Sequence, residues 1–175
     1  PQPDQRRILG AIVPHAGHRY SGPVAAQVYR VIQVQRPKTI VIIMPTHTAM
    51  LNGAVVVTAD ALATPLGEVP VDRALAKKIA ARSALFQNTL PENLFEHSIE
   101  VQLPFLQMAL KDHAFKIVPI YVMASHVQQL EDIAHELLPM VASGNIFVLA
   151  SSDWSHYHSH AQAAKQDHKA LYYLR

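Results

Sequence analysis

Apolar and polar positions divide the chain into short strands and longer helices. Five apolar runs rich in β-branched residues are expected to be strands, at residues 8–13, 39–44, 54–58, 116–123 and 146–150. The run from Ile40 to Ile43 shows no polar alternation, which is typical of a strand covered on both faces. The run 116–123 contains Pro119, which cannot donate a backbone hydrogen bond, so we expect it near an edge or at a bulge.

Helical periodicity fills the gaps between these runs. Helices are expected at about residues 23–34, directly after Asp72, around 103–110, over 130–141 and over 162–169. Val24, Val28 and Ile32 share the expected inner face of the first helix. Asp72 is placed as the N-cap of the second, and Pro104 must either open or kink the third.

The order strand, helix, strand over residues 8–44 is typical of a crossover between parallel strands. The sequence therefore predicts an α/β fold, a three-layer α/β/α sandwich with a largely parallel or mixed central sheet. We find no repeat or linker that suggests a second domain, so one domain is expected over residues 1–175.

Composition narrows the classes of function. Half of the residues are apolar, and Lys plus Arg number 15 against 13 Asp plus Glu, with the basic residues scattered, so nucleic-acid binding is not expected. No apolar run reaches the roughly 20 residues that span a bilayer, and residues 1–7 lack an apolar signal-peptide core, so we expect a cytoplasmic protein without a membrane partner. Cysteine is absent, so any metal in this stretch must use nitrogen and oxygen ligands.

Three of the expected strands lead into histidine, at His15, His47 and His156. In open α/β sheets, pockets form beyond the carboxyl ends of the strands, so these imidazoles are expected to share a pocket and to bind one ion. Asp153 lies in the same loop as His156. It either completes a site of two histidines and one carboxylate or orients a neighbouring imidazole from behind.

Residues 96–100, Glu-His-Ser-Ile-Glu, offer a further cluster, in which His97 is a fourth pocket candidate. The simpler interpretation is a helix start with Ser98 as its cap. His158 and His160 alternate with His156 like a metal tract on a strand, but they lead into a polar helix. The remaining candidates are interpreted as solvated surface residues: His113, His126, His135 and His168.

Several common signatures are missing from the sequence. It contains no Gly-x-Gly-x-x-Gly, no phosphate-binding loop ending in Gly-Lys-Ser/Thr, no Gly-x-Ser-x-Gly and no His-Glu-x-x-His. Nucleotide-dependent and serine-hydrolase functions therefore lose their support.

An ordered set of short motifs resembles the Memo family, whose bacterial and archaeal members are often called AmmeMemoRadiSam system protein B. The motifs are Pro14-His15-Ala16-Gly17, Tyr20-Ser21-Gly22, Pro45-Thr46-His47, Thr64-Pro65-Leu66-Gly67, Glu96-His97-Ser98-Ile99-Glu100, Leu103-Pro104 and Ser151-Ser152-Asp153-x-Ser155-His156. That family resembles the class III extradiol dioxygenases, which open catechol rings with non-haem iron.

The resemblance implies a role for each matching residue. His15 and His47 match the family's two metal-ligand histidines, and His97 matches another pocket residue. Asp153 and His156 match a pocket pair, with His156 in the place of the dioxygenases' acid/base histidine. The implied cofactor is a divalent metal, iron(II) first, with copper or zinc as alternatives.

Family members are longer, begin with an additional segment and take a third metal ligand, a cysteine or carboxylate, from a later region. The chain is therefore expected to be incomplete at both ends relative to the family. Its two-histidine remnant is expected to bind metal weakly or to be empty.

Three functions are carried forward from the sequence. The preferred one is a metal-dependent oxidoreductase, built like a dioxygenase, that acts on an unidentified small molecule or peptide. The second is a non-enzymatic module that binds a peptide or protein in the same pocket. The third is a metal-dependent hydrolase that uses activated water. The sequence assigns neither the substrate nor the oligomeric state.

Overall fold

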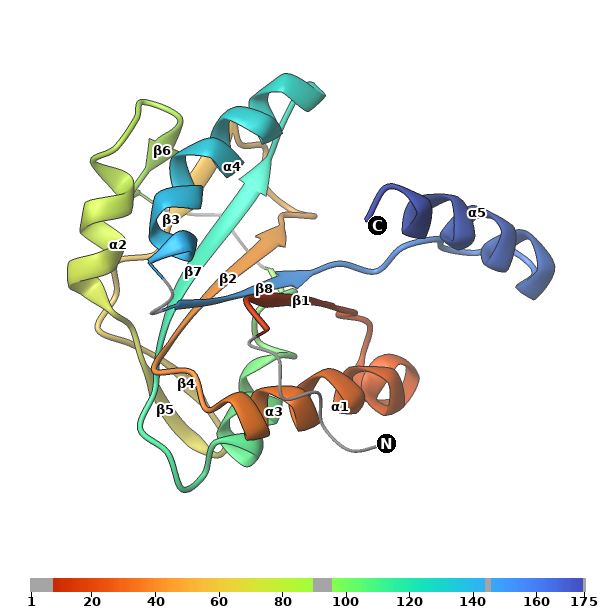
Figure 1. Ribbon diagram of the computed structural model, residues 1–175, viewed down its shortest axis with the longest axis horizontal. Coiled ribbons are helices and arrows are strands. Elements are labelled where there is room, and N and C mark those ends of the chain that lie inside the picture. The colour runs from red at the N-terminus through yellow and green to blue at the C-terminus, as the bar shows by residue number, and fades with distance from the viewer. Residues whose placement is uncertain (1–7, 90–95, 144–145, 175) are drawn as a thin grey trace.

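The computed structural model describes residues 8–89, 96–143 and 146–174, and these form a sheet with helices on both faces (Figure 1). The sheet in this part of the chain has six strands in the order β1, β8, β2, β7, β3, β6. Their bounds are β1 Gly10–Val13, β8 Ile146–Ser151, β2 Thr39–Pro45, β7 Lys116–Met123, β3 Gly53–Val56 and β6 Phe86–Gln87. The first four are parallel, β3 runs antiparallel to β7, and β6 is parallel to β3. The predicted three-layer α/β/α sandwich with a mixed sheet is confirmed.

Within the described ranges, two pairs of helices cover the sheet and a fifth helix stands apart (Figure 1). On one side α1 packs against α3 and β1, and on the other α2 and α4 pack against β3. The helices are α1 His18–Gln35, α2 Arg73–Ala80, α3 Leu103–Ala109, α4 Val127–Ala142 and α5 His160–Tyr172. A separate hairpin is formed by β4, Ala61–Thr64, and β5, Gly67–Pro70. No side chain of α5 is buried.

The core lies along β2 and β7, as the continuous apolar runs predict. Ile40 and Ile42 of β2 and Ile117 and Ile120 of β7 are completely buried. Burial of such a side chain contributes about 1.5–3 kcal/mol relative to leaving it in water. The sheet is therefore a rigid support for the loops that follow its strands.

The predicted edge position of residues 116–123 is wrong, because β7 lies between β2 and β3. Pro119 is tolerated there because its missing N–H falls where pairing with β3 ends. The last pair of that ladder joins Val56 to Ile120, and beyond it the Val57 amide donates to the Pro119 carbonyl at 2.9 Å. A proline in an interior strand costs least at such a ladder end.

The first helix differs from its prediction in both start and buried face. It begins at His18, so Pro23 lies inside the helix. Of the predicted inner residues, Ile32 is fully buried and Val28 packs against the core, but Val24 is 63 % exposed and Tyr29 is buried in addition. Apolar residues occur on more than one side of this segment, and periodicity alone could not decide which side meets the core.

The other helix signals had mixed outcomes. Asp72 caps α2 by accepting the Leu75 amide at 3.0 Å, and Pro104 opens α3 rather than kinking it. Ser98 is not a cap: it is fully buried, and its hydroxyl donates to the Pro45 carbonyl at 3.0 Å.

Residues 1–7, used in the sequence argument about signal peptides, lie outside the described residues. None of the helices in the described ranges has the length and apolar character needed to cross a bilayer.

Candidate metal centre

The carboxyl ends of three parallel strands meet at one edge of the sheet and position the first candidate residues. β8 lies between β1 and β2, with Val13 opposite Ser151 in the register. His15, His47 and Asp153 each follow the last residue of their strand by two positions. Because parallel strands end at the same rim, equal offsets bring these residues to the same place.

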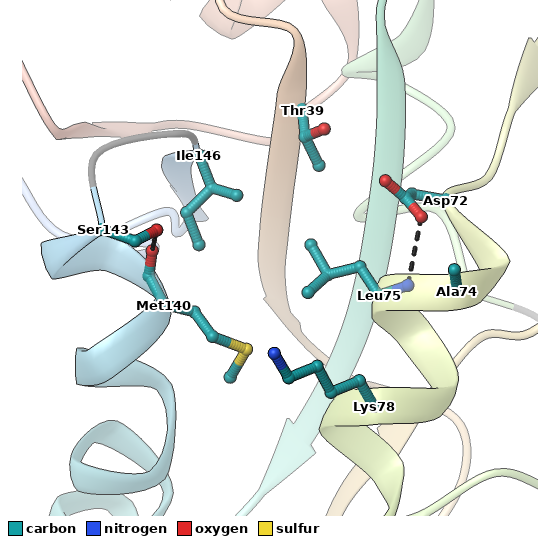
Figure 2. Close-up of a pocket in the computed structure, with 8 residues that line it drawn as sticks. All are labelled: Thr39, Asp72, Ala74, Leu75, Lys78, Met140, Ser143 and Ile146. Atoms are coloured by element: carbon teal, nitrogen blue, oxygen red, sulfur yellow. Dashed lines mark hydrogen bonds between the residues drawn. The ribbon is translucent and has the colours of Figure 1, made fainter.

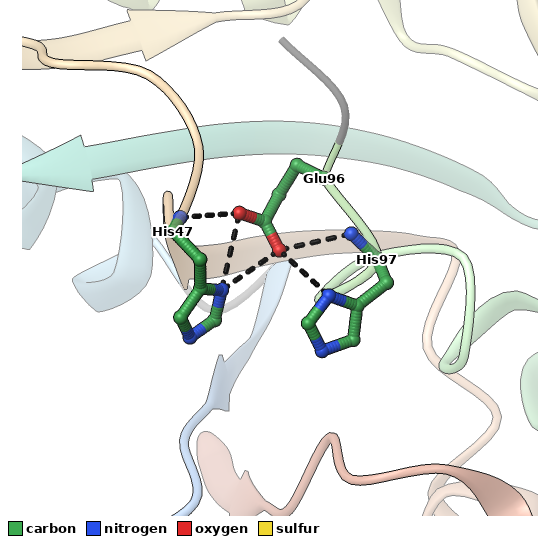
Figure 3. Close-up of side chains that lie close together, drawn as sticks. All are labelled: His47, Glu96 and His97. Atoms are coloured by element: carbon green, nitrogen blue, oxygen red, sulfur yellow. Dashed lines mark hydrogen bonds and ion pairs between the residues drawn. The ribbon is translucent and has the colours of Figure 1, made fainter.

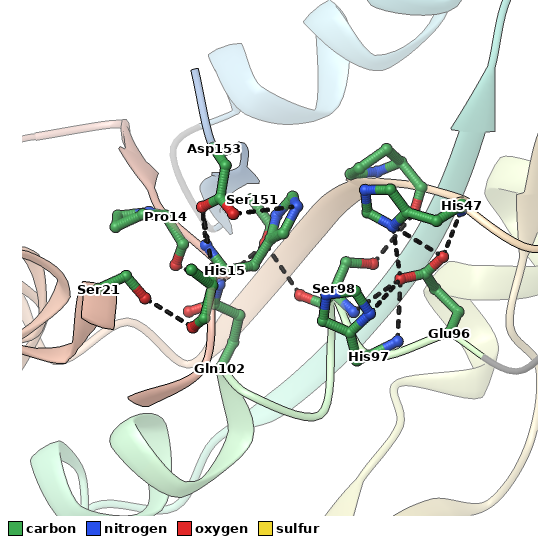
Figure 4. A network of polar contacts seen from close by, with 12 residues as sticks. Pro14, His15, Ser21, His47, Glu96, His97, Ser98, Gln102, Ser151 and Asp153 are labelled. Atoms are coloured by element: carbon green, nitrogen blue, oxygen red, sulfur yellow. Dashed lines mark hydrogen bonds and ion pairs between the residues drawn. The ribbon is translucent and has the colours of Figure 1, made fainter. Parts of the chain in front are cut away.

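Three imidazole rings cluster at this rim (Figure 4). The ring centroids of His15 and His47 are 5.3 Å apart, those of His15 and His97 5.9 Å, and those of His47 and His97 5.2 Å. His97 is supplied by the segment that precedes α3, far from the strand ends in sequence. The structure thus brings together His15, His47 and His97, of which the third came from a separate motif.

Glu96 contacts two of the rings, through hydrogen bonds with His47 and an ion-pair contact with His97 (Figure 3). Its side chain is fully buried and accepts the backbone amides of His47 at 2.5 Å and of His97 and Ser98 at 2.9 Å each. The Nδ1 atom of His47 lies 3.0 Å from one carboxylate oxygen, and that of His97 lies 3.4 Å from the same oxygen. His47, Glu96 and His97 each offer one possible metal-ligand atom, and these three atoms lie within 4.8 Å of one another, close enough to hold a metal ion.

The ionisation of Glu96 reflects a balance between burial and hydrogen bonding. Burial acts to raise the pKa of its carboxyl, but the side-chain and backbone hydrogen bonds from His47 and the Ser98 amide outweigh it, and the pKa falls to about 2. Glu96 is therefore a carboxylate at neutral pH, and a carboxylate can only accept hydrogen bonds.

His15 is the buried member of the cluster, 1 % exposed, and Asp153 holds its backbone. One Asp153 oxygen accepts the amides of His15 at 2.6 Å and Ala16 at 3.1 Å, and the other lies 3.9 Å from His15 Nε2. Burial lowers the pKa of His15, the Asp153 charge acts to raise it, and the neighbouring histidines lower it further. The net shift is downward, so the ring is neutral at pH 7, which is the form that ligates metals.

A network of buried hydrogen bonds lies behind His15. The Nδ1 atom of His15 is 3.0 Å from Ser151 Oγ, and Ser151 donates to the Ser98 carbonyl at 2.9 Å. Gln102 Nε2 donates to Ser151 Oγ at 2.8 Å and to the Pro14 carbonyl at 3.0 Å. The Tyr29 hydroxyl donates to Gln102 Oε1 at 2.5 Å, and burial raises the pKa of Tyr29, which keeps that hydroxyl protonated. These hydrogen bonds connect His15 to Tyr29 of α1 and to Gln102, the N-cap residue of α3.

Sequence reasoning did not single out Glu96, Ser151 or Gln102 as site residues. The acidic residue next to His97 is a usable signal, because the sequence offers residues 96–100 both as a polar cluster and as a helix start. Nothing in the sequence pattern marks Gln102, because its partners come from three other segments.

The structure does not bring His156 to the cluster. It follows β8 by five residues rather than two, is exposed, and has its ring 6.0 Å from that of Tyr157. Tyr157 has a φ of 56°, in the left-handed region, where the chain turns toward α5. His158 and His160 are exposed as well.

The four histidines interpreted as surface residues are all outside the core. His126, His135 and His168 are exposed, and His113 is half-buried with its Nε2 3.2 Å from the Pro37 carbonyl.

Among the hollows lined by described residues, the following pair lies outside the cluster. One, of about 310 Å³, is next to the loop that carries His15 and is lined by Pro14, Trp154 and Val24 among others. The second, of about 410 Å³, contains Thr39 and Ile146, the first residues of β2 and β8 (Figure 2). It therefore lies at the amino end of the sheet, opposite the histidine rim.

The residues at the rim fit a divalent transition metal. The ligand atoms that these residues offer are imidazole nitrogens and carboxylate oxygens, which suit iron, zinc and copper. His15 is in the neutral form that ligation requires, and Glu96 supplies the kind of outer carboxylate that commonly orients metal-binding imidazoles.

Comparisons with known proteins agree on one family. A family model described as "Memo: Memo-like protein" matches residues 1–175. The chain is 36 % identical to a MEMO1 family protein of Methanopyrus kandleri, 38 % to one of Sulfolobus acidocaldarius and 37 % to one of Sulfurisphaera tokodaii. These matches cover 94 %, 97 % and 98 % of this chain but only 59 %, 61 % and 61 % of the relatives, so the chain spans about three fifths of their length.

A solved structure supports the fold alone. The chain resembles the crystal structure of the uncharacterized protein JW3007 from Escherichia coli K12, with a TM-score of 0.51 and 16 % sequence identity. The match covers 76 % of this chain and 54 % of that one.

Proposed function

The chain belongs to the Memo family, and from that premise we propose that its histidine rim binds a divalent metal ion, iron(II) first, and supports oxidation of a small organic or peptide substrate. The single observation that carries the proposal is the clustering of the His15, His47 and His97 rings, with centroids 5.2–5.9 Å apart, beside the carboxylates of Glu96 and Asp153. Imidazole-rich sites with room for further ligands are typical of non-haem iron centres.

Each residue at the rim has a proposed part. His15 and His47 would hold the ion, as the family resemblance implies. Asp153 acts on the backbone, because its bonds to two amides fix the loop that carries His15. When bound, iron(II) would supply the activation of oxygen and the polarisation of a substrate hydroxyl or carbonyl group.

The acid/base role of His156 remains a prediction from the family resemblance. Its exposed position in this structure places it outside the cluster, so the proposal does not require it for metal binding. An acid/base residue affects proton transfer. His156→Gln would therefore lower kcat and change its pH profile while leaving metal affinity unchanged.

The central experiment measures metal and oxygen together. The chain, purified and loaded with iron(II) without oxygen, is mixed with a catechol, and oxygen uptake is recorded. Uptake that requires iron and disappears in His15→Ala and His47→Ala is the expected result. His135→Ala, which changes an exposed histidine, is the matched control and should behave as the unsubstituted chain does.

Failure to bind iron(II), or turnover unchanged in both histidine variants, would overturn the metal-dependent proposal. Product formation without oxygen would instead favour a metal-dependent hydrolase.

A second candidate function is a module that binds a peptide or partner protein without catalysis. The apolar hollow of about 310 Å³ beside Pro14 and Trp154 favours it, since such a hollow can take one apolar side chain. Affinity for a peptide that persists after chelation of metal would support this function. A cytoplasmic location is part of the proposal for either function.

A further inference from the structure

Ser151 has one hydroxyl proton, and its neighbours determine where that proton lies. The Pro14 carbonyl can only accept, so the Gln102 atom that faces it must be the amide nitrogen Nε2. The second proton of this nitrogen is donated to Ser151 Oγ. Ser151 in turn donates to the Ser98 carbonyl. Because the Ser151 hydroxyl proton is used in that bond, Ser151 Oγ can only accept a hydrogen bond from His15 Nδ1, which lies 3.0 Å away.

His15 accordingly carries its ring proton on Nδ1. In a neutral imidazole the other nitrogen then has a free lone pair. That atom, Nε2, lies 3.9 Å from an oxygen of Asp153. A lone pair and a carboxylate oxygen face each other here, an arrangement that attracts a cation.

Glu96 imposes the same proton position on the other two rings. Its two oxygens accept the backbone amides of His47, His97 and Ser98, as a carboxylate does, so a ring nitrogen that faces them must be a donor. His47 Nδ1 lies 3.0 and 3.1 Å from its two oxygens, and His97 Nδ1 lies 3.4 Å from one of them. Figure 3 shows the Nε2 atoms of both rings on the side away from the carboxylate.

We propose that Glu96 and Ser151 are positioning residues that hold His15, His47 and His97 in the Nδ1–H tautomer, so that His97 is a third metal ligand through Nε2. The ligand role rests on the proposed function, but the tautomers do not. The family resemblance placed the third ligand in a later region. This arrangement supplies a third nitrogen donor from within the chain.

The tautomers can be measured directly, without metal or substrate. Histidine-labelled, metal-free chain at about pH 8, above the usual pKa of histidine, gives long-range ¹⁵N–¹H spectra that distinguish the two neutral forms. Neutral histidine in water favours Nε2–H. We expect Nδ1–H for residues 15, 47 and 97, while the exposed His135 shows the solvent mixture. Nε2–H at the three cluster positions would overturn the proposal.

Variants then test what holds the tautomers. Ser151→Ala should return His15 toward the solvent mixture and weaken zinc(II) binding, used as a redox-inert probe, by about 10–100-fold. Ser152→Ala, one residue further, should do neither. Glu96→Gln should perturb His47 and His97 but not His15, and Glu100→Gln is its exposed control. The spectra of the unsubstituted chain remain decisive if a variant does not fold.

The proposed ligand role of His97 is tested separately, by measuring zinc(II) affinity. Zinc competition with a coloured chelator should show His97→Ala to be weakened about as much as His47→Ala, and at least about 10-fold, with His135→Ala unchanged. Unchanged zinc affinity in His97→Ala overturns the ligand role. Nδ1–H tautomers in a chain that binds no zinc would leave the positioning intact and overturn both the ligand role and the proposed function.

Discussion

Two histidine-rich regions of this molecule contrast sharply. The residues His156, His158 and His160 lie close in sequence and look most like a metal tract, yet all three are exposed. The rim histidines 15, 47 and 97 are far apart in sequence, and each has an oxygen partner on Nδ1. Oxygen atoms of Ser151 and Glu96, rather than close spacing of the histidines along the chain, therefore fix the orientation of the rim imidazoles.

The two regions also differ in how many polar groups they bury, and therefore in the desolvation free energy that folding must offset. The rim buries charge and polar groups, which is tolerated only because nearly every donor and acceptor there is paired. His156, His158 and His160 are exposed and α5 has no buried side chain, so these histidines need no such pairing. The contrast predicts large effects of substitution at the rim and small ones beyond β8.

The largest expected effect is that of Glu96→Ala. It leaves the amides of His47, His97 and Ser98 without their acceptor, so the free energy of unfolding should fall by about 3–4 kcal/mol. Urea denaturation followed by circular dichroism measures it. Glu100→Ala, at an exposed position in the same motif, should change stability by less than about 0.5 kcal/mol. Equal effects at the two positions would remove the contrast.

The next effect is a dependence of stability on acidic pH. Because the folded-state pKa of Glu96, about 2, lies below its ordinary value of 4.5, its contribution is fully present above pH 4.5 and is lost as the pH falls toward 2. The loss should reach about 2–3 kcal/mol. Urea denaturation repeated across that pH range measures it, and Glu96→Gln should show a flatter profile. A parallel decline in the two proteins would contradict the assignment.

Gln102→Ala should destabilise somewhat less. It removes the donor to Ser151 and Pro14 and leaves the Tyr29 hydroxyl unpaired, at a cost of about 2 kcal/mol. The matched control is Gln128→Ala on exposed α4 surface, with an expected change below about 0.5 kcal/mol. Thermal and urea unfolding of both variants sharpen the comparison between a buried network and a surface pair.

The smallest effect is expected from His156→Ala. An exposed ring whose contact is with Tyr157 should contribute less than about 0.5 kcal/mol to stability. Zinc affinity should stay within about two-fold of the unsubstituted chain, far from the loss expected at His47. A large loss of zinc binding would show that His156 reaches the rim in solution, and the distinction between the two regions would fail.

The rim itself was only partly predictable. His15, His47 and Asp153 share an offset of two residues from strands that the hydrophobic pattern had located, so their convergence followed from parallel pairing. His156 was grouped with them because it follows the same strand, but it lies three residues further along the loop and is exposed. A sequence shows which loop a residue belongs to, and the direction of that loop depends on its backbone angles.

Sequence alone located the strands β1, β2, β3, β7 and β8 and the sheet edge that carries His15, His47 and Asp153, since both depend on local periodicity and on the geometry of parallel strands. It did not predict the hairpin of β4 and β5 or the short strand β6. Tertiary structure alone decided that β7 is interior, that Glu96 turns inward, and that Ser151 and Gln102 stand behind His15. These outcomes depend on contacts between distant segments. A buried donor takes whichever acceptor the fold places within about 3 Å, regardless of separation along the chain.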